Sequence, residues 1–146
     1  MLPVTPTSPE AIHEGGCLCG GVRYRITGTI PPAVHCHCSM CRKGSGGTVV
    51  TWVSVPLNRF KFTVGEPKVY QSSGHGRRSF CPTCGAQLTF YSSNSPESID
   101  VTSVSLDHPE RHPPNRHIWT TNRLPWLHVD EHLPQYPEWT PPDQQS

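Results

Sequence analysis

Hydrophobic and polar residues alternate along several short stretches of the chain. In GVRYRITG three apolar residues alternate with two arginines, and in RFKFTVG the same period of two puts Phe60, Phe62 and Val64 on one face. TVVTWVSV (48–55) is β-branched or aromatic almost throughout, as in a buried strand. The apolar patterns of two later stretches predict further strands at 86–91 and 98–106.

No stretch keeps the i, i+3, i+4, i+7 spacing of an amphipathic helix over three turns. The 17 prolines and 12 glycines also suit strands and loops, and 146 residues suffice for one core. We therefore predict a mostly β domain at residues 14–132. Residues 1–13 and the proline-rich tail 133–146 lack a strand pattern, so we expect them to be flexible or draped over the surface.

Charge is nearly balanced, with 12 Lys and Arg against 11 Asp and Glu, and it indicates no nucleic-acid partner. No apolar run approaches the ~20 residues that span a bilayer, which argues against a membrane partner. The first residues show neither the basic nor the apolar region of a secretory signal. We expect a cytoplasmic protein, in which cysteines are metal ligands or reactive thiols before they are disulfides. The sequence gives no indication of the oligomeric state.

Seven cysteines fall into three groups with the spacings of metal ligands: Cys17 and Cys19, then Cys36, Cys38 and Cys41, then Cys81 and Cys84. Zinc takes four protein ligands at a structural site and three at a catalytic site, which keeps one position open. Seven divides as four plus three. The CPTCG turn and the glycines of GGCLCGG let their sulfurs converge, so we predict that these two groups share a structural zinc. The middle group would hold a second, catalytic zinc.

Spacing leaves two alternatives open. Cys81 and Cys84 can instead share a metal with two thiols of the middle group. Their CxxC spacing also occurs in redox dithiols, although no βαβ pattern surrounds it here.

Basic residues and histidines flank these groups. Four basic residues suit the binding of an anionic substrate, with solvated surface charge as the competing interpretation: Arg42, Lys43, Arg77 and Arg78. Either His35 or His37 would close the middle site as a fourth ligand or carry a proton, but we favour a supporting or surface role for both. We expect the later histidines at the surface: His108, His112, His117, His128 and His132. Trp119 and Trp126 are predicted to cap the core.

GGCLCGGVRY, HCHCSMCRKGSGG and RRSFCPTCGAQLTFY, in this order and at these separations, resemble the glutathione-dependent formaldehyde-activating enzyme family, which includes centromere protein V-like domains. HIWTTNRLPW (117–126) is similar to the family's C-terminal segment. The resemblance implies an Mss4-like fold, a β-tent of packed antiparallel sheets with zinc sites. It also implies that Cys17, Cys19, Cys81 and Cys84 hold the structural zinc and that Cys36, Cys38 and Cys41 hold the catalytic one.

The same resemblance implies an enzyme that adds glutathione to formaldehyde to give S-hydroxymethylglutathione, classed as a carbon–sulfur lyase in the reverse direction. Glutathione-specific members are longer than this chain, so we predict addition of a thiol, with glutathione as first choice, to formaldehyde or another small aldehyde. Zinc held by three sulfurs is a soft Lewis acid suited to a fourth sulfur. The competing hypotheses are a non-catalytic zinc module that binds a protein and a thiol redox or metal sensor.

Overall fold

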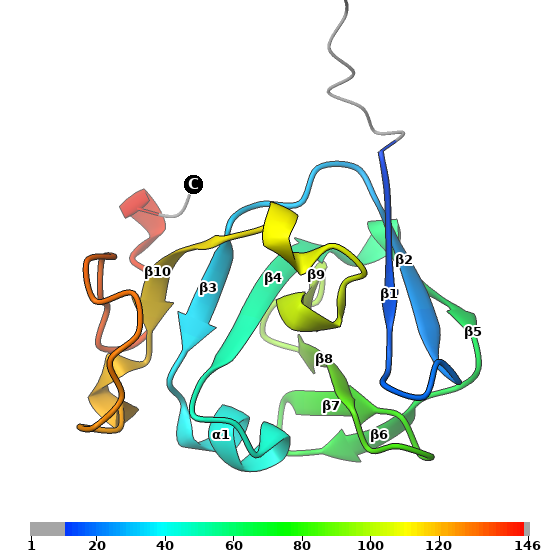
Figure 1. The fold of residues 1–146 in the computed structure, drawn as a ribbon, viewed down its shortest axis with the longest axis horizontal. Coiled ribbons are helices and arrows are strands. Elements are labelled where there is room, and N and C mark those ends of the chain that lie inside the picture. The colour runs from blue at the N-terminus through cyan, green and yellow to red at the C-terminus, as the bar shows by residue number, and fades with distance from the viewer. Residues whose placement is uncertain (1–10, 145–146) are drawn as a thin grey trace, which may run out of the picture.

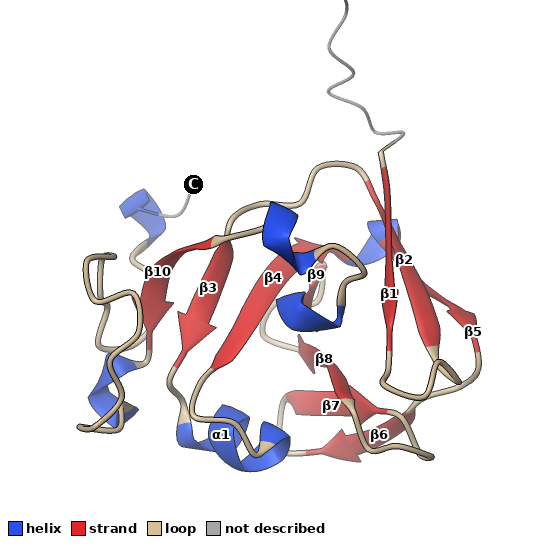
Figure 2. Cartoon of the chain, in the orientation of Figure 1, coloured by secondary structure: helices blue, strands red, loops and turns tan. Residues whose placement is uncertain are grey.

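The computed structural model describes residues 11–144, which are mostly β-strand, as predicted (Figures 1 and 2). The strands within this range are β1 Ile12–Gly16, β2 Arg23–Thr27, β3 Ala33–Cys36, β4 Val50–Pro56, β5 Phe60–Val64, β6 Lys68–Gln71, β7 Gly76–Phe80, β8 Gln87–Ser92, β9 Ser98–Thr102 and β10 Pro114–Ile118. One short α-helix, α1, spans Ser39–Ser45. Single 3₁₀ turns complete the described part: η1 Leu57–Arg59, η2 Ser103–Ser105, η3 Pro109–Arg111, η4 Thr120–Asn122 and η5 Pro142–Gln144. No helix in this range has the length and apolarity needed to cross a membrane.

The strands form two sheets. The smaller sheet has the order β1-β2-β5, and the larger has the order β10-β3-β4-β9-β8-β7-β6. Neighbouring strands are antiparallel except for β10 and β3, which run parallel. Figure 1 shows the small sheet on the side of the molecule away from β10. Packed antiparallel sheets therefore make up the fold, as the resemblance implied.

The main core contains residues of both sheets. Tyr24 and Ile26 of β2 are fully buried, as their alternation with arginines predicts, and they cluster with Val53 and Val55 of β4. Trp52 belongs to a second cluster together with Cys36 and Cys41. Because successive side chains of a strand point to opposite faces, β4 serves one core on each of its faces. The middle cysteines therefore belong to a different core from that of β2.

Two sequence predictions about apolar residues are wrong. Val64 is 51% exposed, because it ends the edge strand β5 opposite a register shift at Arg23. Trp126 is 64% exposed in the loop after η4, whereas Trp119 packs against the second core cluster as predicted.

The C-terminal segment lies along β10. The His117 N–H donates to the Pro134 carbonyl at 2.8 Å, and the Tyr136 N–H donates to the His117 carbonyl at 3.0 Å. Thr140, further along, is buried. The fold thus extends beyond residues 14–132 at this end, and β1 extends it to Ile12 at the other. Of the predicted flexible segment 1–13, residues 1–10 lie outside the described residues.

Candidate functional site

Four cysteines from distant parts of the chain meet where the two sheets approach each other. The Sγ atoms of Cys17, Cys19, Cys81 and Cys84 all lie within 4.8 Å of one another. None of the four is in a disulfide. Four thiols this close suit the tetrahedral coordination of one zinc ion, so the donor set fits that metal. The structure therefore places Cys81 and Cys84 with the first cysteine group and apart from the middle group.

Two tight turns aim these sulfurs and supply hydrogen-bond donors to them. After β1, the Val22 N–H donates to Cys17 Sγ at 3.2 Å and the Gly21 N–H donates to Cys19 Sγ at 3.4 Å. After β7, Gly85 adopts φ 76°, a conformation that favours glycine, where the chain leaves the CPTCG turn. The N–H groups of Ala86 and Cys19 lower the pKa of Cys84 to about 6. Such donors stabilise thiolates, the form in which cysteine binds zinc.

The middle cysteines lie at the junction of β3 and α1. Cys36 ends β3, Cys38 is the N-cap of α1, and Cys41 is buried within the helix. Cys36 Sγ lies 3.6 Å from Cys41 Sγ. A hydrogen bond from Cys36 lowers the pKa of Cys38 to about 5, assisted by the N–H groups of Cys41 and Met40. A hydrogen bond from Cys36 also lowers the pKa of Cys41.

The middle trio is a looser set than the four-thiol group. Within residues 11–144, the four-thiol group is the only one in which three or more ligand atoms lie within 4.8 Å of one another. Cys36 and Cys41 are buried, whereas Cys38 is half-buried. Hydrogen bonds to Cys38 and Cys41 raise the pKa of Cys36, so the trio shares its remaining proton on Cys36. Three thiols on one short segment still fit a soft metal ion, because sulfur is a ligand that zinc prefers.

Of the four basic residues predicted to bind substrate, two have partners close to the trio. Arg78 of β7 is buried, and its Nη1 and Nη2 atoms each lie 3.8 Å from Cys41 Sγ. Arg42 Nη1 donates to the carbonyl oxygens of His37, at 3.0 Å, and Asn122. Lys43 and Arg77 are exposed.

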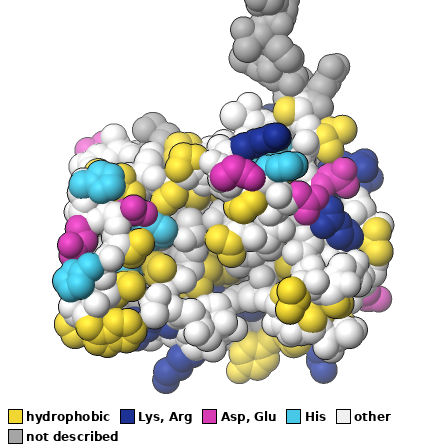
Figure 3. Space-filling model, viewed as in Figure 1, with side chains coloured by type: hydrophobic (Ala, Val, Ile, Leu, Met, Phe, Trp, Pro, Cys, Tyr) yellow, Lys and Arg dark blue, Asp and Glu magenta, His cyan; other side chains and the backbone are white. Residues whose placement is uncertain are grey.

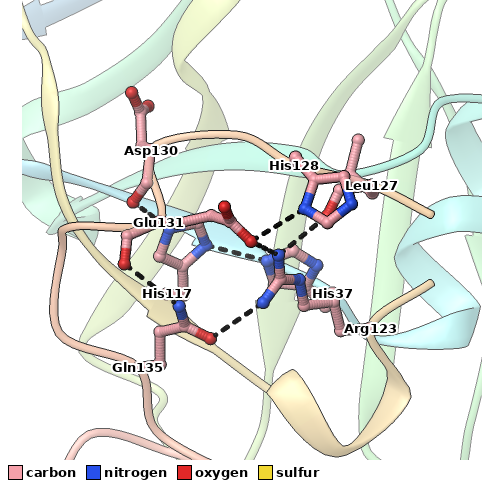
Figure 4. A network of polar contacts seen from close by, with 8 residues as sticks. All are labelled: His37, His117, Arg123, Leu127, His128, Asp130, Glu131 and Gln135. Atoms are coloured by element: carbon pink, nitrogen blue, oxygen red, sulfur yellow. Dashed lines mark hydrogen bonds and ion pairs between the residues drawn. The ribbon is translucent and has the colours of Figure 1, made fainter. Parts of the chain in front are cut away.

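Two buried histidines, His37 and His117, form a chain of hydrogen bonds (Figure 4), and His37 lies between Cys36 and Cys38 in the sequence. His117 Nε2 lies 2.9 Å from the Asp130 carbonyl oxygen, which can only accept, so this nitrogen carries the proton. In the neutral ring, His117 Nδ1 then accepts from His37 Nε2, 2.8 Å away. His37 Nδ1 consequently keeps its lone pair, and it is buried without a hydrogen-bond partner. Burial, helped by the nearby charge of Arg123, lowers the pKa of His37 to about 4, which keeps this ring neutral.

His35 is anchored on both ring nitrogens. Its Nδ1 lies 2.8 Å from Thr51 Oγ1, and its Nε2 lies 2.8 Å from the Asp130 carboxylate. No histidine nitrogen in residues 11–144 joins the middle cysteines in a set of three ligand atoms within 4.8 Å. These contacts agree with the supporting role that the sequence analysis favoured for His35 and His37.

The prediction of a surface position is wrong for His117, which is 1% exposed. The C-terminal segment covers it, and the same segment supplies Asp130. The part played by these two residues was not predicted from the sequence, although His117 lies in the stretch similar to the family's C-terminal segment. His108, His128 and His132 are exposed as expected, and Figure 3 shows histidines at the surface on the β10 side.

Comparison with known proteins gives a consistent result. A sequence model of the family described as "Glutathione-dependent formaldehyde-activating enzyme" (GFA) matches residues 12–122. A Halomonas elongata protein named "Putative glutathione-dependent formaldehyde-activating enzyme" is 29% identical over 126 residues, 80% of each chain. A crystal structure of a Rhodobacter sphaeroides protein shares the fold, with a TM-score of 0.55 at 20% identity over 84% of this chain and 98% of that one.

Proposed function

Because the chain belongs to the glutathione-dependent formaldehyde-activating enzyme family, we propose that it is a zinc-dependent enzyme that adds a thiol to formaldehyde or another small aldehyde. The product is an S-hydroxymethyl adduct, and the reverse reaction is that of a carbon–sulfur lyase. The family match over residues 12–122 carries this proposal, and the name of the Halomonas relative supports glutathione as the thiol. Seven free cysteines also favour a reducing, cytoplasmic location.

We propose that the chain holds two zinc ions. Cys17, Cys19, Cys81 and Cys84 would hold a structural ion, and Cys36, Cys38 and Cys41 would hold a catalytic ion. Zinc bound by three thiolates would stabilise an incoming thiol as its thiolate and so keep a nucleophile ready at neutral pH. The contacts of His35 support an open fourth position, since both of its ring nitrogens have other partners.

Carbon–sulfur bond formation needs a thiolate and one proton. The thiol releases its proton, its sulfur attacks the carbonyl carbon, and the carbonyl electron pair moves to oxygen, which then takes up a proton. Lys43 lies two residues after Cys41 in α1 and is exposed, and Arg77 is exposed on β7. We propose that these two cations attract the carboxylates of an anionic thiol such as glutathione. Arg42 instead links the residue before the helix to the 3₁₀ turn η4, because it donates to the carbonyl oxygens of His37 and Asn122.

Exchange spectroscopy tests the proposal directly, because glutathione and formaldehyde also combine without help. Proton NMR of an equilibrium mixture measures how fast free and hydroxymethylated glutathione interconvert. The zinc-loaded protein should accelerate this exchange, and Cys38→Ser should return it to the background rate. Met40→Leu, a change at an exposed position of the same helix, is the matched control.

Repeating the exchange assay with different thiols and aldehydes tests the reaction class separately from the identity of the substrate. Acceleration with cysteine or another thiol but not with glutathione would support the reaction class and reject the substrate. A fully loaded protein that leaves every thiol–aldehyde pair at the background rate would reject the enzyme. A non-catalytic zinc module would then be the better description.

A further inference from the structure

Arg78 is a buried cation with an unusual set of neighbours. The residue is 8% exposed, and its Nε donates to Ser72 Oγ at 3.2 Å. Its guanidinium carbon lies 4.7 Å from the centroid of the Phe90 ring. Among the ion pairs of residues 11–144, none joins Arg78 to a carboxylate. Its two terminal nitrogens both face Cys41 Sγ at 3.8 Å.

The buried charge of Arg78 needs a negative charge close to it, and the nearest candidate is the sulfur of Cys41. Arginine stays protonated in proteins, and a buried charge without a counter-charge is strongly destabilising. Ser72 and Phe90 are neutral, so the sulfur is the neighbour able to carry the compensating charge. Three thiolates around a divalent zinc leave a net charge of about −1, which one guanidinium neutralises. The geometry therefore suits Cys41 as a thiolate within a metal centre.

We propose that Arg78 is the counter-cation of the Cys36, Cys38 and Cys41 centre, a positioning residue that balances the charge of the centre and slows release of the metal. This inference rests on the second zinc of the proposed function. It gives Arg78 a different role from its neighbour Arg77, which is exposed on the same strand. Adjacent residues of a strand point to opposite faces, so only one of the two arginines reaches the sulfur.

Metal release tests the inference without substrate. The purified zinc protein is mixed with a chromogenic chelator, and the phase of release that disappears in Cys38→Ser is assigned to the middle centre. Arg78→Met should release this metal at least about tenfold faster, the usual size of an effect from a group that supports a metal ligand. Arg78→Lys, which keeps the charge, should recover most of the loss. In this substrate-free assay Arg77→Met should release the metal at the wild-type rate, and the four-thiol phase should stay unchanged in all variants.

Three results would overturn the inference. Wild-type release rates in Arg78→Met would show that the guanidinium does not hold the centre. Equal acceleration of both phases in the Met and Lys variants would show a packing role alone. A wild-type protein with a single zinc would remove the second metal from the proposed function and this inference with it. If Arg78→Met does not fold, Arg78→Gln provides the neutral variant. The metal-release assay contains no aldehyde, so its result does not depend on turnover. Lack of turnover in the exchange assay would therefore reject the proposed function without contradicting the role of Arg78.

Discussion

Cys19 Sγ lies 3.7 Å from Cys81 Sγ, although the two residues are 62 positions apart. Cys19 is in the loop between β1 and β2 of the small sheet, and Cys81 directly follows β7 of the large sheet. The four-thiol group therefore joins the two sheets at one point. A metal bound there would close a long loop of chain and contribute to the free energy of folding.

Replacing one of these thiols should unfold the domain. Structural zinc binding is worth roughly 10–16 kcal/mol in small zinc domains, which matches or exceeds the stability of most folded domains, about 5–15 kcal/mol. We expect Cys84→Ser to lose this zinc and its cooperative thermal transition, as followed by circular dichroism together with zinc analysis. Thr83→Ser, in the same turn, should behave as the wild type. A Cys84→Ser protein that lacks the metal but melts at the wild-type temperature would show that the site does not stabilise the fold.

Cys38→Ser should have the opposite profile. Cys38 is half-buried at the N-cap of α1, where serine is a favoured residue, so the substitution should cost less than about 1 kcal/mol of folding free energy. The variant should bind one zinc fewer than the wild type and melt within a few degrees of it. Thermal melts and metal counts on Cys38→Ser and Cys84→Ser make the comparison. Equal destabilisation would contradict separate roles for the two cysteine groups.

The alternating apolar residues predicted the core strands well, because their burial depends on a local pattern. Tyr24 and Ile26 are buried as expected, and β4 and β8 lie close to their predicted ranges. The predicted strand at 98–106 is too long, because β9 ends at Thr102 and the 3₁₀ turn η2 follows. Strand β6 was not predicted, because its four residues, KVYQ, show no alternation of apolar and polar positions. All four are exposed. Strand β10 escaped because its sequence, PNRHI, has no apolar alternation. Its burial comes from the segment after residue 133, a contact that no local pattern encodes.

Cysteine spacing likewise predicted part of the site. It grouped the seven thiols and favoured the pairing of Cys17 with Cys81 that the structure shows. It could not distinguish Arg77 from Arg78, because no pattern in the sequence predicts strand β7, which turns these two side chains to opposite faces. Nor could it find the bonds of His117, since these depend on the C-terminal segment folding back over β10.

The tautomers of the buried histidines can be measured. The Asp130 carbonyl fixes the proton of His117 on Nε2, and the hydrogen bond between the rings then fixes that of His37 on Nε2 as well. Long-range proton–nitrogen NMR spectra at neutral pH should show both rings neutral and protonated on Nε2. The exposed His132 provides a reference ring in the same spectra. A proton on Nδ1 of either ring would contradict this direction of the hydrogen-bond chain.

Asp100 of β9 should make stability depend on pH in a direction opposite to that of most carboxylates. Burial raises its pKa from 3.8 to about 6, and a hydrogen bond from Ser54 offsets only part of this effect. Between these two values the folded state keeps a proton that the unfolded chain has released, so stability falls as pH rises through this range. Asparagine cannot ionise, and Asp100→Asn should therefore gain stability relative to the wild type as pH rises.

The size of the Asp100 pKa shift sets how much stability Asp100→Asn should gain relative to the wild type. Urea unfolding of the wild type and Asp100→Asn should show a stability difference that is larger by about 1 kcal/mol at pH 7.5 than at pH 5, since a shift of one pKa unit corresponds to about 1.4 kcal/mol. Asp143→Asn, at an exposed position, controls for the loss of one negative charge. Any acid-induced loss of metal affects both proteins and cancels in the difference. A stability difference that is the same at both pH values would mean that the Asp100 carboxylate is as well solvated in the fold as in the unfolded chain.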